Sequence, residues 1–97
     1  MEKGRVVHSP LFLLRYSIEN GSGGSKFAAV APQKVAKKAT ERNKIRRKIY
    51  EAVKFNYSKV KNDVKGAIFA KKKLDGVDFD DLAEEIKQLF VKAAIMK

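Results

Sequence analysis

Apolar residues along the chain first form two short runs, each typical of a β-strand. Residues 11–18 are mainly apolar and aromatic, and Pro10 just before them is unsuited to a helix interior, so we predict a strand there. A second run over residues 26–31 ends at Pro32 and predicts another strand.

The segment between these two runs is rich in glycine and serine. Such residues favour turns, so we predict a hairpin whose flexible loop covers residues 19–25. Residues 21–25 also match an engineered linker, and because natural loops use the same residues, both origins stay open.

The pattern becomes helical near Thr40, whose side chain suits an N-cap and is followed by an acidic residue. A helix is predicted from there through about residue 57 or 60. At about 100° per residue, one stripe of this helix is apolar and should pack on the sheet: Ile45, Ile49, Ala52, Val53 and Val60. The neighbouring stripe, which we call the cationic flank, consists of Asn43, Arg46, Arg47, Tyr50 and Lys54.

Two further elements complete the predicted fold. Residues 63–70 predict a third strand, and Asp78 or Asp80 is the expected N-cap of a last helix. That helix has apolar residues at helical spacing: Phe79, Leu82, Ile86, Leu89, Phe90 and Ala93. The order β-β-α-β-α predicts one α+β domain over residues 1–97, a small sheet with helices packed on it and residues 1–8 as an N-terminal segment.

Composition indicates the kind of partner. The chain has 22 Lys and Arg against 11 Asp and Glu, a formal charge of +11, which predicts a polyanionic partner. The apolar runs fall well short of a membrane span, and no signal-peptide pattern is found, so we expect a cytoplasmic protein that does not enter membranes. Cysteine is absent, which excludes disulfides and thiolate sites.

The positive charge is concentrated between residues 34 and 61, where half of the basic residues lie and only Glu41 and Glu51 oppose them. Guanidinium and amide groups at this spacing are the groups that bind phosphate and ribose. A solvated helix face is the competing interpretation, but arginine stands in place of lysine at Arg42, Arg46 and Arg47, which favours RNA.

The remaining polar groups do not indicate a catalytic or metal site. His8 has no second histidine or cysteine to share a metal ion, and the acidic residues 78–85 fit the start of a helix, where the macrodipole favours them. Residues 71–73, three lysines, could extend the basic surface or protect a strand end. The aromatic residues of the two strands favour the core: Phe12, Tyr16 and Phe27.

Residues 34–49, KVAKKATERNKIRRKI, closely resemble the signature of the bacterial ribonuclease P protein family, an Arg-Asn-Arg box followed by a further basic pair. The likeness continues on both sides. Residues 9–16 and 26–35 resemble the family's first long strand and the strand before its basic loop, and residues 63–71 and 79–93 resemble its last strand and last helix.

This resemblance implies a fold like the second domain of ribosomal protein S5, with a left-handed β-α-β crossover between parallel strands. It also implies a non-catalytic protein subunit of an RNA-based endoribonuclease. The catalytic RNA would remove the 5′ leader of precursor tRNA by phosphodiester hydrolysis, with Mg²⁺ bound mainly by the RNA and none by the protein alone. A ribosomal or general structural RNA-binding protein is the alternative.

The resemblance and the cationic flank together give the predicted RNA-binding residues: Lys34, Lys37, Lys38, Arg42, Asn43, Lys44, Arg46, Arg47, Tyr50 and Lys54. The exposed sheet face is implied to form a cleft for the single-stranded leader. If alternation along the first strand turns Phe12, Leu14 and Tyr16 to the core, the cleft residues are Leu11, Leu13 and Arg15.

The chain departs from the family's pattern in three places. Lys44 replaces the third residue of the Arg-Asn-Arg box, which removes a planar fork, and residues 32–33 replace the usual serine and lysine. The family's first helix, which walls the leader cleft, would end before this chain starts, and both a natural absence and a removed helix fit this. We therefore expect the open sheet face to be covered by RNA, another protein or a second copy of the chain.

Overall fold

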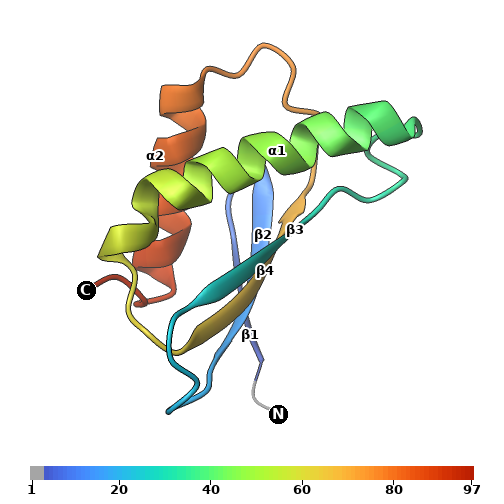
Figure 1. Ribbon diagram of the computed structural model, residues 1–97. Coiled ribbons are helices and arrows are strands. Elements are labelled where there is room, and N and C mark those ends of the chain that lie inside the picture. Colours follow the sequence, from blue (N-terminus) through green and yellow to red (C-terminus); the bar gives the residue numbers. More distant parts are fainter. Residues whose placement is uncertain (1–3) are drawn as a thin grey trace.

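The computed structural model describes residues 4–97, so residues 1–3 of the predicted N-terminal segment lie outside the described part (Figure 1). Four strands form one sheet in the order β1-β2-β4-β3. They are β1 (Arg5–His8), β2 (Phe12–Ile18), β3 (Lys26–Val30) and β4 (Val64–Ala70). The helices are α1 (Ala39–Asn56), followed by a short 3-10 turn over Tyr57–Lys59, and α2 (Phe79–Lys92). The predicted α+β class is confirmed.

Strand β1 was not predicted. Its four residues pair antiparallel with β2, and three of them are exposed because β1 lies at the edge of the sheet. A short, exposed edge strand has no alternation long enough to be seen in a sequence, since only one of its edges is hydrogen-bonded.

The predicted hairpin between β2 and β3 is wrong, because β4 lies between the two strands. The connecting loop instead wraps around the start of β4, where Asp63 has a left-handed φ of 70°. The Asp63 carboxylate accepts a hydrogen bond from the Gly23 backbone N–H at 2.8 Å, and the Asp63 N–H donates to the Gly23 carbonyl at 2.9 Å. Strand pairing is decided by residues far apart in the sequence, and two neighbouring runs do not reveal a third strand inserted between them.

Helix α1 connects β3 to β4, which are parallel neighbours. Figure 1 shows both helices on one side of the sheet and the β3-α1-β4 crossover with a left-handed turn, as the resemblance implied. Most such crossovers in proteins are right-handed. The crossover places one long flank of α1 beside β3, which is the edge strand on the side of the sheet opposite β1.

The core lies between the sheet and the two helices. Alternation along β2 turns Phe12, Leu14 and Tyr16 toward the helices, as predicted, and four residues of the predicted helical stripe are buried in the same core: Ile45, Ile49, Ala52 and Val53. Val60 is buried too, but it lies after α1 and the 3-10 turn, because the helix ends before it. The helix begins at Ala39, so Lys38 rather than Thr40 occupies the N-cap position, and no side chain caps it. Asp78 holds the N-cap position of α2, one of the two residues proposed for it.

Candidate nucleic-acid interface

The cationic flank of α1 is accessible over its whole length. Asn43, Arg46, Arg47 and Tyr50 line one open hollow of about 440 Å³, and Lys54 is exposed one helical turn further on. The Arg46 guanidinium donates to the Asn43 side-chain oxygen, which holds the guanidinium along the helix surface. Residues four apart on a helix lie about 6 Å apart along its axis, so Arg46, Tyr50 and Lys54 follow one another on the flank at this interval, with Arg47 beside Arg46.

Arg42 makes hydrogen bonds within the protein. Its Nη1 donates to the carbonyls of Ala36 at 3.1 Å and Lys37 at 2.7 Å, so this guanidinium fastens the loop before α1 to the first turn of the helix. The loop residues Lys37 and Lys38 are exposed next to it. We infer that Arg42 places these lysines beside the cationic flank, and that part of its donor capacity is used within the protein.

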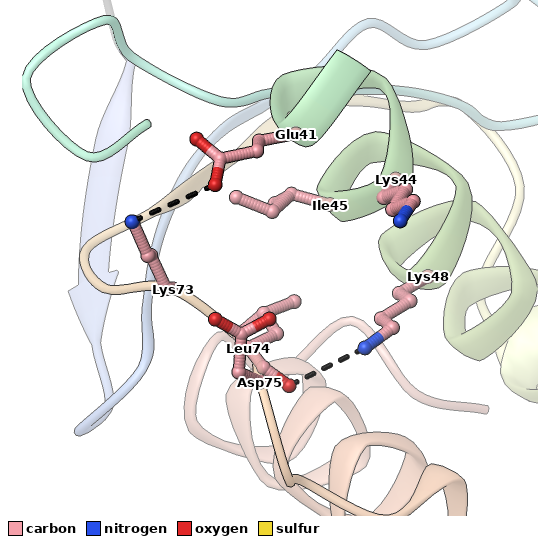
Figure 2. A pocket seen from close by; sticks show the side chains of 7 residues that line it. All are labelled: Glu41, Lys44, Ile45, Lys48, Lys73, Leu74 and Asp75. Carbon is pink, nitrogen blue, oxygen red and sulfur yellow. Dashed lines mark hydrogen bonds and ion pairs between the residues drawn. The ribbon is translucent and has the colours of Figure 1, made fainter. Parts of the chain in front are cut away.

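Lys44 lies apart from the cationic flank. It lines a small hollow between α1 and the β4–α2 connection, together with Lys48, Glu41 and Lys73 (Figure 2). There the Lys73 ammonium lies 3.7 Å from the Glu41 carboxylate, and the Lys48 ammonium donates to the carbonyl of Leu74 at 3.4 Å. These two contacts attach the β4–α2 connection to α1. Lys44 therefore lies on a different side of the helix from the other predicted RNA contacts of α1.

The sheet face turned away from the helices, which we call the open sheet face, carries a second hollow of about 300 Å³. Leu13, Arg15 and Lys34 all line it, so the basic loop and the sheet share one surface. Leu11 does not join them: it precedes β2 and packs against the core, and its N–H donates to the Glu85 carboxylate at 2.7 Å.

The sequence reasoning did not assign Phe69 to this face, and it left open whether Lys71 extends the basic surface. Phe69 pairs with Leu13 across β2 and β4, and the Arg15 guanidinium lies 5.8 Å from the centre of its ring. The ring and the cation are thus close enough for a cation–π contact. Lys71 also lines the hollow and donates to the Ser9 carbonyl at 2.9 Å. Alternation within residues 63–70 would have placed Phe69 here.

No metal-binding group and no membrane span emerge from the described residues. Among residues 4–97, no three His, Asp or Glu side chains lie close enough together to hold a metal ion. Within the same range, neither helix is long and apolar enough to cross a membrane.

Comparison with known proteins indicates the family of the chain. The sequence model of the family described as Ribonuclease P matches residues 1–94. The chain is 32% identical over 91 residues to the ribonuclease P protein component of Prochlorococcus marinus (strain AS9601), covering 92% of this chain and 71% of that protein. The protein of the same name from Microcystis aeruginosa is 29% identical over 89 residues, covering 92% of this chain and 74% of that protein.

Solved structures give the same result for the fold. The RNase P protein from Thermotoga maritima matches with a TM-score of 0.81 at 26% identity, covering 93% of this chain and 84% of that one. The RNase P protein of Staphylococcus aureus also matches with a TM-score of 0.81, at 18% identity over 98% of this chain and 85% of that one, and it supports the fold alone.

Proposed function

Because the chain belongs to the family of bacterial ribonuclease P proteins, we propose that it binds the RNA subunit of that enzyme through the cationic flank of α1 and the basic loop before it. Family membership makes it a ribonuclease P subunit with a role in the 5′ processing of tRNA and with the ribonuclease P RNA as partner. The match decides against the alternative, a ribosomal or general structural RNA-binding protein.

The observation that carries this proposal is the row of exposed cations on α1. Arg47 and Lys54 are exposed on the same flank, and the Arg42 hydrogen bonds hold Lys37 and Lys38 next to it. Each phosphate that such a cation neutralises releases condensed counterions, which drives association without any sequence preference. The planar arginine fork adds bidentate hydrogen bonds that fix the RNA relative to the helix.

We assign the hydrolysis itself to the RNA subunit. Magnesium would activate the attacking water and polarise the phosphate there. This assignment is consistent with residues 4–97, among which no group of three carboxylate or imidazole side chains lies together. In this proposal the protein contributes positive charge and geometry, and no catalytic step passes through its own residues.

Precursor tRNA is the proposed second partner, through the open sheet face. Leu13 and Phe69 offer apolar and aromatic surface to the bases of a single-stranded leader, and Arg15 and Lys71 offer charge to its phosphates. Lys34 lies where this face meets the basic loop, so one RNA assembly could contact both surfaces. This arrangement supports leader binding beside the catalytic RNA.

Self-association through the open sheet face is a separate proposal. Val6 on β1 is 44% exposed and pairs with Arg15, so an apolar strip continues to the sheet edge. Light scattering of the free chain should show a dimer that dissociates when RNA covers this face. A monomer at all accessible concentrations would contradict this proposal and leave RNA binding untouched.

The function is tested by cleavage of precursor tRNA with the cognate catalytic RNA at low magnesium, with and without this chain. We expect the chain to lower the magnesium requirement and raise the cleavage rate, because its cations reduce repulsion between the two RNAs. Binding to the catalytic RNA without any stimulation would contradict a role in cleavage.

The interface is tested with the double variant Arg46→Ala/Arg47→Ala. Its RNA affinity should fall, and the slope of log K against log salt should decrease by roughly one unit for each phosphate that the variant no longer neutralises. The matched control Lys59→Ala/Lys61→Ala removes the same charge from exposed positions beyond the end of α1. Equal slopes for the two variants would place the arginines off the RNA.

A further inference from the structure

Between α1 and the edge strand β3 lies a hollow of about 460 Å³, which shares Tyr50 and Lys54 with the cationic flank. We call it the aromatic hollow. Its lining combines three aromatic rings with one cation and two small or aliphatic side chains: Phe27, Tyr50, Tyr57, Lys54, Val53 and Ser58. Aromatic rings exposed together beside cations are a candidate site for a flat, negatively charged ligand.

The two tyrosine rings are held in place by their hydroxyl groups. The Ala29 backbone N–H donates to the Tyr50 hydroxyl at 3.3 Å, and the Tyr57 hydroxyl donates to the Ser25 carbonyl at 2.6 Å. Both contacts lie at or beside the free edge of β3. Their polar ends thus engage the protein, while the side chains of Tyr50 and Tyr57 remain 47% and 43% exposed. Fixed rings with free surface lose little conformational entropy when a flat ligand stacks on them.

Phe27, the third ring of the aromatic hollow, is held by contacts with the protein core. It stacks on the buried Phe90, with ring centres 5.1 Å apart. Gly66 lies opposite Phe27 on β4, and a Cβ atom at Gly66 would come within 2.9 Å of the Phe27 ring. The ring therefore lies directly over the glycine, and its remaining exposed surface faces the aromatic hollow.

The aromatic hollow continues into the cationic flank. Tyr50 lines both hollows, with Arg46 one turn before it on the helix and Lys54 one turn after it. Aromatic rings interleaved with cations at about 6 Å intervals are the arrangement that proteins use for single-stranded nucleic acid, where cations track the backbone and rings stack on bases. A groove for an apolar protein helix would not need this row of cations.

We propose that the aromatic hollow accepts an unpaired base of an RNA strand whose backbone follows the cationic flank. The site takes a nucleobase of any kind, because stacking uses the π-face that every base has. This inference rests on the proposed function, since it needs RNA on the α1 flank. It adds a second kind of contact to that surface, one that distinguishes single-stranded RNA from a bare chain of phosphates.

The test compares two probes of equal charge, oligouridylate of about eight residues and an abasic ribose-phosphate strand of the same length. Their dissociation constants are measured by fluorescence anisotropy at one salt concentration. The chain should bind oligouridylate about tenfold more tightly than the abasic strand, as expected for one or two stacked bases. Equal affinity for both probes would overturn the proposal.

Two double variants separate the rings from their hydroxyl groups. Tyr50→Leu/Tyr57→Leu removes rings and hydroxyls and should abolish the preference for oligouridylate over the abasic strand. Tyr50→Phe/Tyr57→Phe removes the hydroxyls alone and should keep the preference. If the leucine variant keeps the preference, the rings only shield the edge of β3 or face a protein partner, and the proposal is wrong.

Tyrosine emission provides an independent measurement. The chain has no tryptophan and three tyrosines, of which Tyr16 is buried in the core. Quenching by oligouridylate but not by the abasic strand is expected, and an unquenched spectrum at saturation would overturn the proposal. The variant Arg46→Ala/Arg47→Ala should weaken both probes equally. If the arginine variant weakens RNA binding but the leucine variant does not change it, the proposed function stands and the base site is wrong. If the arginine variant binds both probes like the unmodified chain, the proposed function itself is wrong.

Discussion

Replacement of Gly66 by alanine tests how closely the sheet and the aromatic residues are packed. The added Cβ atom would lie 2.9 Å from Cδ1 and 3.0 Å from Cε1 of Phe27, and 3.3 Å from the Arg15 carbonyl oxygen. Phe27 has little room to retreat into the core, because it stacks on the fully buried Phe90. Overpacking of this kind costs about 1–3 kcal/mol, whereas replacing glycine restores about 0.4–1 kcal/mol through the unfolded chain.

We therefore expect Gly66→Ala to lower the free energy of unfolding by about 1–2 kcal/mol, measured by urea denaturation. In a domain of this size, that is a decrease in Tm of roughly 5–15 °C. The control is Gly4→Ala, because nothing lies within 4 Å of a Cβ atom at Gly4. This control should unfold like the unmodified chain.

A double-mutant cycle with Phe27→Leu identifies the cause. Leucine has no Cε atom, and its δ-carbons are not fixed in a ring and can turn away from the added methyl group, so Gly66→Ala should cost about 1 kcal/mol less in the leucine background. An equal cost in both backgrounds would refute the reasoning, because it would assign the loss to the backbone near Arg15. In the single variant, the Phe27 ring should shift toward the aromatic hollow and reduce the preference for oligouridylate over the abasic strand.

Substitutions at three further residues test individual hydrogen bonds of the fold. Asn56 is buried, and its amide donates to the carbonyls of Ala52 at 3.0 Å and Ala83 at 3.1 Å. Asn56→Ala should therefore lower the free energy of unfolding by about 2 kcal/mol. A change below about 0.5 kcal/mol, the level of a neutral surface substitution, would contradict this. Arg42→Ala should speed hydrogen exchange in residues 33–38, because the loop loses both of its guanidinium hydrogen bonds, and unchanged exchange would show that the loop is held otherwise. Asp63→Ala removes the carboxylate bond to the β2–β3 loop and leaves a β-carbon at positive φ, with an expected loss of about 1 kcal/mol in urea denaturation. Asp63→Gly should lose less, and the reverse order would contradict the role of the left-handed backbone.

The sequence alone determined which face of each main helix and strand is buried and that the candidate binding surface is positively charged. Ile45, Ile49 and Val53 recur at the period of a helix, and Phe12, Leu14 and Tyr16 recur at the period of a strand, so the buried face of each element could be predicted. The cationic flank followed from the same helical period. These properties depend on neighbours within a few residues, which the sequence contains directly.

Only the tertiary structure decided which distant residues meet. The insertion of β4 between β2 and β3 and the pairing of β1 depend on contacts between residues far apart in the chain. The aromatic hollow depends on the same kind of contact, since it needs β3 to lie at the free edge of the sheet beside α1. Local periodicity leaves such pairings open, because burial of a whole sheet face and the satisfaction of backbone hydrogen bonds select among them collectively.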